Sequence, residues 1–229
     1  MTPPSAPDPQ PRVSGRGAIR PFRAVGAWLS PTILQAWWER LRGRLRPRAC
    51  PYSLAGALEV PGRRLVAAPE RVLGAFGVRA GQTVLEIGPG TGFYSIEGAR
   101  RVGGRGRLIC LDVQPEMLQH TRRRLQAAGL EAMFVQADAC ALPLRSASVD
   151  HVILITVLGE IPDRPAALAD IGRILRPGGH LSVAEQFPDP DFVTRRTLRR
   201  QLSAAGFTEG KTRGWLFYTS TWSRDLPKE

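Results

Sequence analysis

The sequence has no apolar run of the roughly 18–20 residues that a membrane-spanning helix needs, so we expect no transmembrane segment. Its first ten residues are rich in proline and lack a basic start followed by an apolar core, which excludes a secretory signal there. Its three cysteines, Cys50, Cys110 and Cys140, are too few and too scattered for a disulfide framework or a C-x-x-C metal site. These absences predict a cytoplasmic protein without a bound metal.

Lysine is almost missing, since 30 of the 32 basic residues are arginine. The net charge of +12 has two explanations: a GC-rich genome that favours arginine codons, or an anionic partner such as nucleic acid or a membrane surface. Residues 1–68 carry eleven basic and three acidic groups, whereas residues 69–229 carry 21 and 17. The excess therefore lies mainly in the front segment.

The chain is predicted to divide into a basic N-terminal segment, 1–68, and a main domain, 69–229. Residues 1–27 mix Pro, Gly, Arg and Ser without a sustained period, which predicts a mobile arm. An amphipathic helix is expected over about 30–46, followed by a connector. This helix either packs its apolar face over the main domain, lies on an anionic bilayer with its two tryptophans at headgroup depth, or mediates dimerisation. Peripheral membrane contact is one of these three expectations.

The main domain alternates strand and helix patterns. We expect strands at Thr83–Ile87, Leu108–Leu111, Ala132–Val135, Val149–Thr156 and His180–Ala184, and two more within Phe207–Trp222. We expect helices at Pro69–Phe76, about Thr91–Val102, Pro115–Ala128, Pro165–Leu175 and Thr194–Ala205. This order predicts an α/β fold with a doubly wound, mostly parallel sheet and helices on both faces. Only Gly214 separates the last two strands, so they should pair antiparallel at the sheet edge.

A glycine-rich turn follows the first predicted strand, in the order Glu86-Ile87-Gly88-Pro89-Gly90-Thr91-Gly92. Glycines there allow a sharp turn and let a ligand lie against the main chain. A dinucleotide fingerprint would need G-x-G-x-x-G, but position 93 is Phe. The Glu86 carboxylate would also repel a pyrophosphate, whereas it suits a ligand that carries an ammonium and a sulfonium.

Two aspartates follow the next two predicted strands. Asp112 ends the second strand, where a carboxylate can accept both hydroxyls of a ribose. Asp138 follows the third strand, where it can accept a hydrogen bond from the amine of an adenine, and the Ala139 N–H can donate to a ring nitrogen. The series predicts a site for an adenosine-containing ligand at consecutive strand ends.

With these motifs, and with Leu175-Arg176-Pro177-Gly178-Gly179 before the fifth strand, the sequence resembles the class I S-adenosylmethionine-dependent methyltransferases. The stretches Ala141–Leu144 and Leu158–Asp163 are most similar to the ubiquinone/menaquinone-biosynthesis branch. The resemblance implies a Rossmann-like seven-stranded sheet whose last strand is antiparallel, and S-adenosylmethionine as cofactor. It implies the following cofactor-binding residues: Glu86, Gly88, Gly90, Gly92, Asp112, Val113, Asp138, Ala139 and Thr156.

The sequence carries no obligatory catalytic signature, because methyl transfer needs a base only if the acceptor arrives protonated. Glu160, shortly after the fourth strand, is the candidate for orienting or deprotonating an acceptor, and Gln186–Phe192 is a candidate acceptor-facing loop. The leading interpretation is methyl transfer to a small or lipid-like organic acceptor. The alternatives are a cofactor-binding module without turnover, or a nucleic-acid methyltransferase that docks through its basic front segment, although no aromatic and basic stacking platform favours nucleic acid.

Overall fold

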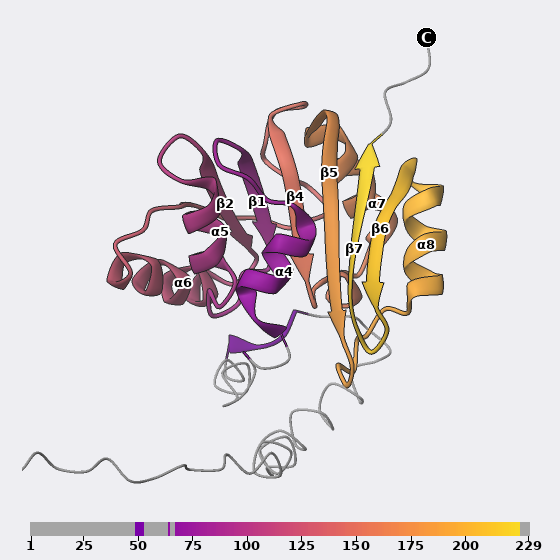
Figure 1. Cartoon of the computed structure of the whole chain (residues 1–229), viewed down its shortest axis with the longest axis horizontal. Coiled ribbons are helices and arrows are strands. Elements are labelled where there is room, and N and C mark those ends of the chain that lie inside the picture. The colour runs from indigo at the N-terminus through magenta and orange to yellow at the C-terminus, as the bar shows by residue number, and fades with distance from the viewer. Residues whose placement is uncertain (1–48, 53–63, 65–66, 225–229) are drawn as a thin grey trace, which may run out of the picture.

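The computed structural model describes residues 49–52, 64 and 67–224 (Figure 1). The arm predicted over 1–27 and the helix predicted over about 30–46 lie outside these residues, and the division of the chain near residue 68 stays a prediction. Of the helices that are described, none is long and apolar enough to cross a bilayer.

One seven-stranded sheet runs through the described domain, in the order β3-β2-β1-β4-β5-β7-β6. The strands are β1 (Thr83–Ile87), β2 (Arg107–Asp112), β3 (Met133–Gln136), β4 (Val149–Ile155), β5 (Leu175–Gln186), β6 (Phe207–Gly214) and β7 (Phe217–Arg224). Strands β1 to β5 pair in parallel, and β7 pairs antiparallel with both β5 and β6. The predicted Rossmann-like sheet, mostly parallel with an antiparallel last strand, is confirmed.

Helices cover both faces of this sheet (Figure 1). The helices α4 (Pro69–Phe76), α5 (Ser95–Val102) and α6 (Pro115–Ala127) pack on one face, and α7 (Arg164–Ile174) and α8 (Arg195–Ala204) on the other. Successive strand residues point to opposite faces, so Val84 joins the core under α4 and α5 while Leu85 joins the core under α7. This double burial explains why five of the seven residues of β4 are apolar.

The start of α5 was predicted wrongly. The sequence pattern placed it at about Thr91, but the helix begins at Ser95. Residues 91–94 form turns, and Gly92 has a φ of 77°, which a right-handed helix cannot include. The glycine turn is therefore longer than expected, and its last residues face the site rather than joining the helix.

Several strand boundaries also differ from the prediction, most of them by one residue. Strand β5 begins at Leu175 instead of His180, because the predicted Pro-Gly-Gly turn is an irregularity within the strand: its register with β4 shifts between Val149 and His151. Strand β4 ends at Ile155 instead of Thr156, which has a φ of 55° and leaves the extended conformation.

A tight hairpin joins β6 to β7 and ends at Trp215 and Leu216. Gly214 has a φ of 85°, and a Cβ there would lie 2.0 Å from the Phe217 carbonyl oxygen, so only glycine fits. Gln186, the last residue of β5, pairs with Phe217 at the start of β7. The hairpin tip therefore lies at the sheet edge where the parallel strands have their carboxyl ends.

Candidate active site

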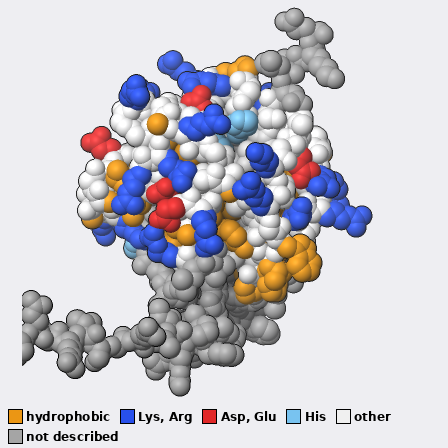
Figure 2. Space-filling view, viewed as in Figure 1, with side chains coloured by type: hydrophobic (Ala, Val, Ile, Leu, Met, Phe, Trp, Pro, Cys, Tyr) orange, Lys and Arg blue, Asp and Glu red, His pale blue; other side chains and the backbone are white. Residues whose placement is uncertain are grey.

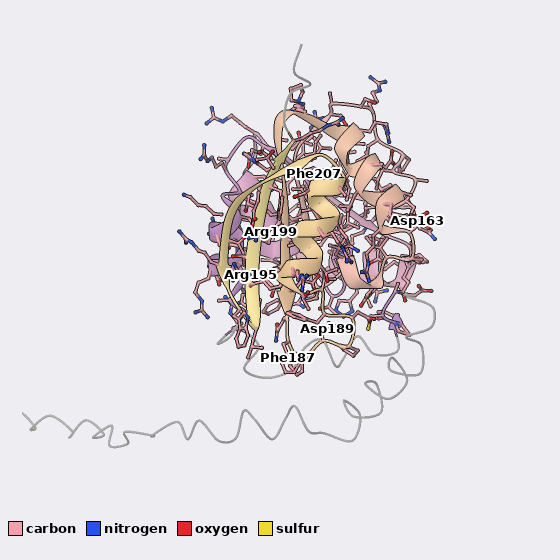
Figure 3. The ribbon with its side chains drawn as sticks, turned by 90° about the vertical axis from the view of Figure 1, so that its right-hand side faces the viewer. Asp163, Phe187, Asp189, Arg195, Arg199 and Phe207 are labelled. Atoms are coloured by element: carbon pink, nitrogen blue, oxygen red, sulfur yellow. The ribbon has the colours of Figure 1, made fainter. Side chains whose placement is uncertain are left out.

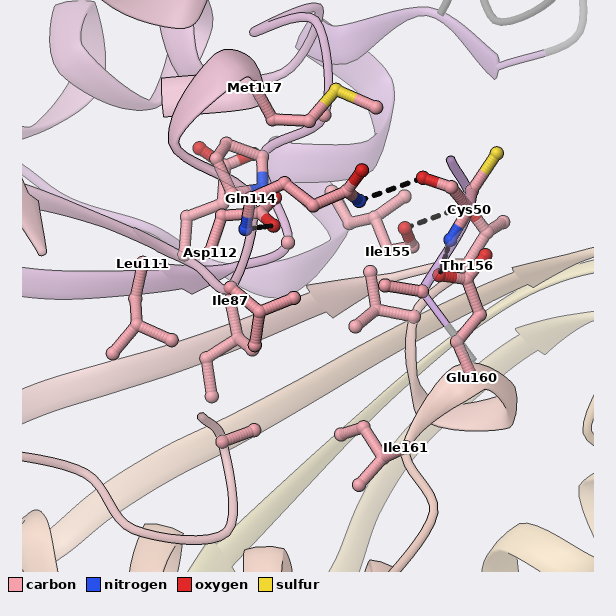
Figure 4. Close-up of a pocket in the computed structure, with 18 of the residues that line it drawn as sticks. Cys50, Ile87, Leu111, Asp112, Gln114, Met117, Ile155, Thr156, Glu160 and Ile161 are labelled. Atoms are coloured by element: carbon pink, nitrogen blue, oxygen red, sulfur yellow. Dashed lines mark hydrogen bonds between the residues drawn. The ribbon is translucent and has the colours of Figure 1, made fainter. Parts of the chain in front are cut away.

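A cavity of about 330 Å³ opens at the carboxyl ends of β1, β2 and β4 (Figure 4). This volume lies at the lower end of the range for small-molecule sites, and the location is the one where open α/β sheets bind ligands. Eight of the nine predicted cofactor-binding residues line it: Glu86, Gly88, Gly90, Asp112, Val113, Asp138, Ala139 and Thr156. Gly92 is absent from the lining residues.

The glycine turn forms one wall of the cavity. Gly88 and Gly90 have φ values of 68° and 57°, which favour glycine. A Cβ on Gly88 would lie 2.6 Å from Cγ2 of Val157, so a side chain there would also displace the loop after β4. Gly92 lies against α6 instead: a Cβ added at this position would be 3.0 Å from Cγ2 of Thr121. Gly92 therefore holds the turn against a helix.

Glu86 is a buried carboxyl group at this wall, only 3% exposed. The Ser95 hydroxyl donates to its Oε2 at 2.6 Å, and the Cys110 thiol lies 3.9 Å from the same oxygen. Burial raises the pKa of Glu86 to about 7, although these two contacts act in the opposite direction. None of the described side chains that shift this pKa is cationic, so a positively charged ligand group would favour the ionised form.

Asp112 ends β2 and is also largely buried. Its Oδ1 accepts a hydrogen bond from the Gln114 N–H at 3.0 Å. Burial raises the pKa of this carboxyl group, against backbone hydrogen bonds that lower it. Its neighbour Val113 is exposed at the cavity margin. The carboxylate therefore faces the cavity from a fixed position at a strand end.

Asp138 lies at the neighbouring strand end, because the Ala137 N–H donates to the Asp112 carbonyl at 3.1 Å. Its Oδ1 accepts from the Cys140 N–H at 2.8 Å, which closes an Asx turn and fixes the carboxylate. Asp138 is exposed, whereas Ala139 is buried. The structure thus brings the two predicted aspartates to one end of the cavity, joined through the backbone.

Thr156 lines the opposite wall in a strained conformation. Its φ of 55° is uncommon for a β-branched residue and costs free energy. The surroundings hold it there, since its N–H donates to the Ala184 carbonyl at 2.8 Å and its hydroxyl donates to the Ile155 carbonyl at 2.7 Å. Such strain is often retained where a backbone group must face a ligand.

A short segment that no sequence pattern indicates, residues 49–52, crosses the cavity mouth, and we call it the strap. The Gln114 side chain binds it twice. Its Nε2 donates to the Cys50 carbonyl at 2.8 Å (Figure 4), and its Oε1 accepts from the Tyr52 N–H at 2.9 Å. The Tyr52 ring also contacts the His120 ring edge-on at 6.3 Å. No local sequence pattern signals these contacts, because they join residues more than 60 positions apart.

Glu160 lines the cavity, as the prediction of an acceptor-side carboxylate requires. Its Oε2 accepts a hydrogen bond from the Cys50 N–H at 2.9 Å, so in this state it holds the strap. Asp189, within the predicted acceptor-facing loop, lines the cavity as well. Within the described residues, no group of three or more His, Cys, Asp or Glu side chains could hold a metal ion.

Comparison with known proteins agrees with this geometry. Residues 84–179 match the family model described as a methyltransferase domain. The ubiquinone/menaquinone biosynthesis C-methyltransferase of Marinomonas is 39% identical over 117 residues, which are 50% of this chain and 46% of that protein. The protein of the same name from Hahella chejuensis is 41% identical over 111 residues, 48% of this chain and 45% of that protein. The chain thus spans less than half the length of these curated relatives.

Solved structures share the fold. The S-adenosylmethionine-dependent methyltransferase from Aquifex aeolicus matches with a TM-score of 0.71 and 24% identity over 76% of this chain and 98% of that one. The [4+2]-cyclase SpnF matches with a TM-score of 0.61 and 18% identity over 69% of this chain and 80% of that one. The second name illustrates that one fold supports different reactions, so these two likenesses establish the architecture alone.

Together, the family match and the turn, carboxylates and glycines at the strand ends indicate S-adenosylmethionine as the cofactor. Residues 84–179 thus carry a methyltransferase domain, and over about half its length the chain is similar in sequence to the ubiquinone/menaquinone C-methyltransferases.

Proposed function

We propose that this protein transfers a methyl group from S-adenosylmethionine to a small, lipid-like organic acceptor of the quinol type. The observation that carries the proposal is that buried carboxyl groups and apolar side chains line the same cavity. Glu86 and Asp112 supply the carboxyl groups, and the apolar wall includes Phe93, Ile155 and Ile161. A cationic cofactor and an apolar acceptor would then bind side by side.

In this proposal, different residues bind the three parts of the cofactor. Glu86 and the backbone of Gly88 and Gly90 would hold the methionine part, which carries the cationic groups. Asp112 and Val113 would hold the ribose, and Asp138 with Ala139 would hold the adenine. The fit is supported by the small space at Gly88, where a Cβ would clash with Val157, and by the buried Thr91 hydroxyl, which has no hydrogen-bond partner among the described residues.

S-adenosylmethionine supplies a methyl carbon that its sulfonium already activates for displacement. The protein's part is to hold the acceptor in line with that carbon and to exclude water. The strap and Ile161 would restrict water on the acceptor side. If the acceptor atom carries a proton, that proton must leave as the new bond forms, and Glu160 and Asp189 are the cavity-lining carboxylates in reach of this side.

The preference for a quinol-type acceptor rests on the curated relatives, whose names specify ubiquinone and menaquinone biosynthesis. The apolar lining supports an acceptor of this kind, because an aromatic ring gains free energy when it leaves water for such a wall. The acceptor atom would then be a ring carbon, as the term C-methyltransferase in those names implies for the relatives.

Calorimetry with S-adenosylmethionine tests the first half of the proposal, and sub-millimolar binding is expected. Transfer of a labelled methyl group to a hydroquinone with a short alkyl tail tests the second half. Binding without transfer to this acceptor or to any fraction of a cell extract would favour a cofactor-binding module without turnover. Labelling of the RNA fraction alone would favour a nucleic-acid methyltransferase instead.

A further inference from the structure

Three large hydrophobic side chains are exposed beside one another at the carboxyl edge of β5, β6 and β7. Trp215 and Leu216 form the tip of the β6–β7 hairpin and are 76% and 53% exposed, and Phe187 in the loop after β5 is 55% exposed. The Phe187 N–H donates to the Leu216 carbonyl, which joins the loop to the tip. We call these three residues the tip cluster, and Figure 2 shows hydrophobic side chains gathered at this lower corner.

Arginines surround the tip cluster. The first turns of α8 carry Arg195, Arg196, Arg199 and Arg200, all exposed. Arg199 forms an ion pair with Glu209 of β6 at 2.6 Å. The Arg195 guanidinium donates to the Gly214 carbonyl at 3.2 Å, so α8 lies directly against the hairpin (Figure 3). A groove between them is lined by Phe192, Trp215 and Leu216 on one side and by arginines of α8 on the other.

The positive charge of the main domain is concentrated in α8, β6 and β7. Residues 194–224 carry seven basic and one acidic side chains, a net charge of +6, whereas residues 69–193 carry 13 basic and 14 acidic ones. Of these seven, Arg224 lies at the end of β7 that is far from the tip. A genome that favours arginine codons does not explain why the excess falls in one edge of the domain. The surface at α8 and the hairpin therefore complements an anionic partner.

The tip cluster is continuous with the cavity mouth. Phe187 stands two residues before Asp189, which lines the cavity, and its ring contacts the Phe192 ring edge-on at 6.2 Å. The Phe192 ring in turn contacts Tyr218 at 5.9 Å. One loop thus reaches from the exposed apolar surface to the acceptor side of the cavity.

We propose that this edge docks on an anionic lipid bilayer, with the tip cluster in the headgroup region and the α8 arginines against lipid phosphates. Exposed tryptophan and aliphatic side chains flanked by arginines favour this depth, because their apolar parts leave water while the guanidinium groups stay near phosphates. Docking turns the cavity mouth toward the membrane, from which a lipid-like acceptor enters. This role for the edge rests on the proposed function, although docking itself is measurable without turnover.

Nucleic acid is a less suitable partner for this edge. Single-stranded nucleic acid binds where bases stack on flat aromatic faces along a basic groove. Here Leu216 offers no stacking face, and Phe187 and Trp215 protrude from two loops at a corner of the domain. A protruding apolar corner enters a bilayer interface more readily than it follows a sugar-phosphate backbone.

Flotation of the full chain with vesicles tests the inference, with phosphatidylcholine vesicles containing 30% phosphatidylglycerol compared with pure phosphatidylcholine. The wild type should bind the anionic vesicles, and salt should weaken this binding. The double variant Trp215→Ser with Leu216→Ser should lose roughly tenfold or more in affinity. Arg196→Glu with Arg200→Glu should lose a similar factor, since each basic residue near an anionic surface contributes about fivefold.

Matched controls lie at the opposite edge of the sheet. Met133 on β3 is 54% exposed, and Arg123 lies exposed on α6, so Met133→Ser and Arg123→Glu remove equivalent groups away from the hairpin. Both should float like the wild type, and every variant should retain the wild-type melting temperature and its binding of S-adenosylmethionine.

Failure of the wild type to float, or equal flotation of the tip variant, would overturn the docking inference. Equal flotation would assign membrane contact to another part of the chain, such as residues 30–46. Loss of single-stranded RNA binding in the tip variant without any vesicle binding would replace the bilayer with nucleic acid. None of these outcomes touches the proposed function, which fails separately if S-adenosylmethionine does not bind.

Discussion

The two sides of the cavity are built differently. On the side that we propose for the cofactor, Glu86 lies within a strand, Asp112 ends one and Asp138 follows one shortly after its end, so the sheet itself fixes their positions. On the side that we propose for the acceptor, Glu160 and the strap come from segments far apart in the chain and meet through side-chain hydrogen bonds. The sheet therefore stabilises the cofactor side, whereas a few side-chain hydrogen bonds hold the acceptor side. We therefore expect cofactor affinity to depend on the first side and acceptor entry on the second.

Replacing Glu86 with Gln should have the largest effect. The folded-state pKa of about 7 exceeds the ordinary value of 4.5, so the folded protein favours the protonated carboxyl group, and this group makes folding less favourable as pH rises. When the pH rises from 5 to 8, the wild type should lose about 2–3 kcal/mol of unfolding free energy that Glu86→Gln does not lose. Urea denaturation of the ligand-free proteins at both values measures the difference.

The same group predicts a pH-dependent affinity for the cofactor. A cationic ligand favours ionised Glu86, so binding releases a proton and the affinity should rise with pH up to about 7 and then level off. Glu86→Gln should bind more weakly and lose this slope. The control is Glu131→Gln, since Glu131 is exposed. An identical slope in wild type and Glu86→Gln would contradict a role for Glu86 at the cofactor.

Replacing Asp112 with Ala should weaken binding of S-adenosylmethionine by about 2 kcal/mol, roughly thirtyfold, because hydrogen bonds to a charged acceptor are lost. Asp112→Asn should lose less, since its amide oxygen can still accept from the Gln114 N–H. Calorimetry measures both, with Glu131→Ala as the control. Unchanged affinity in Asp112→Ala would refute the ribose role.

The cofactor side could be predicted from sequence because its determinants are local. A buried strand, a glycine turn and an aspartate at the next strand end each have their own signal, and parallel pairing brings the strand ends to one edge. Gly92 was predicted to contact the cofactor for the same reason: its spacing fits the motif, although it does not line the cavity and Thr121 on α6 occupies the space beside it.

The hydrogen bonds that hold the acceptor side could not be predicted from sequence, because they depend on tertiary structure. Gln114 reads as an ordinary residue before a helix, and nothing local indicates that its amide binds the backbone of Cys50 and Tyr52. Glu160 was identified as a carboxylate near the acceptor, but its hydrogen bond to the Cys50 N–H joins residues 110 positions apart. The basic surface at α8 was not recognised either, because the net charge was summed over residues 69–229, in which the nearly neutral residues 69–193 precede it.

Replacing Gln114 with Ala should loosen the acceptor side alone. The Tyr52 N–H loses its acceptor and the Cys50 carbonyl its donor, a loss of about 1 kcal/mol for each neutral hydrogen bond. Hydrogen exchange of the Tyr52 amide should accelerate roughly fivefold, while affinity for S-adenosylmethionine changes little. Gln126→Ala, on the exposed side of α6, is the control. Unchanged exchange in the strap would show that other contacts hold it.

We expect the smallest effect from glycine substitutions at two strained residues, which lie at opposite ends of β4. Thr156 and Ala147 both have positive φ values, 55° and 51°, but only Thr156 lines the cavity. Glycine relieves the strain at each position, and this gain outweighs the opposing cost of the chain entropy that glycine adds to the unfolded state, so each substitution should stabilise the protein by about 0.5–1 kcal/mol. Only Thr156→Gly should also weaken binding of S-adenosylmethionine, because the wall it forms becomes less fixed. Equal affinity in both variants would mean that the strain at Thr156 serves the turn alone.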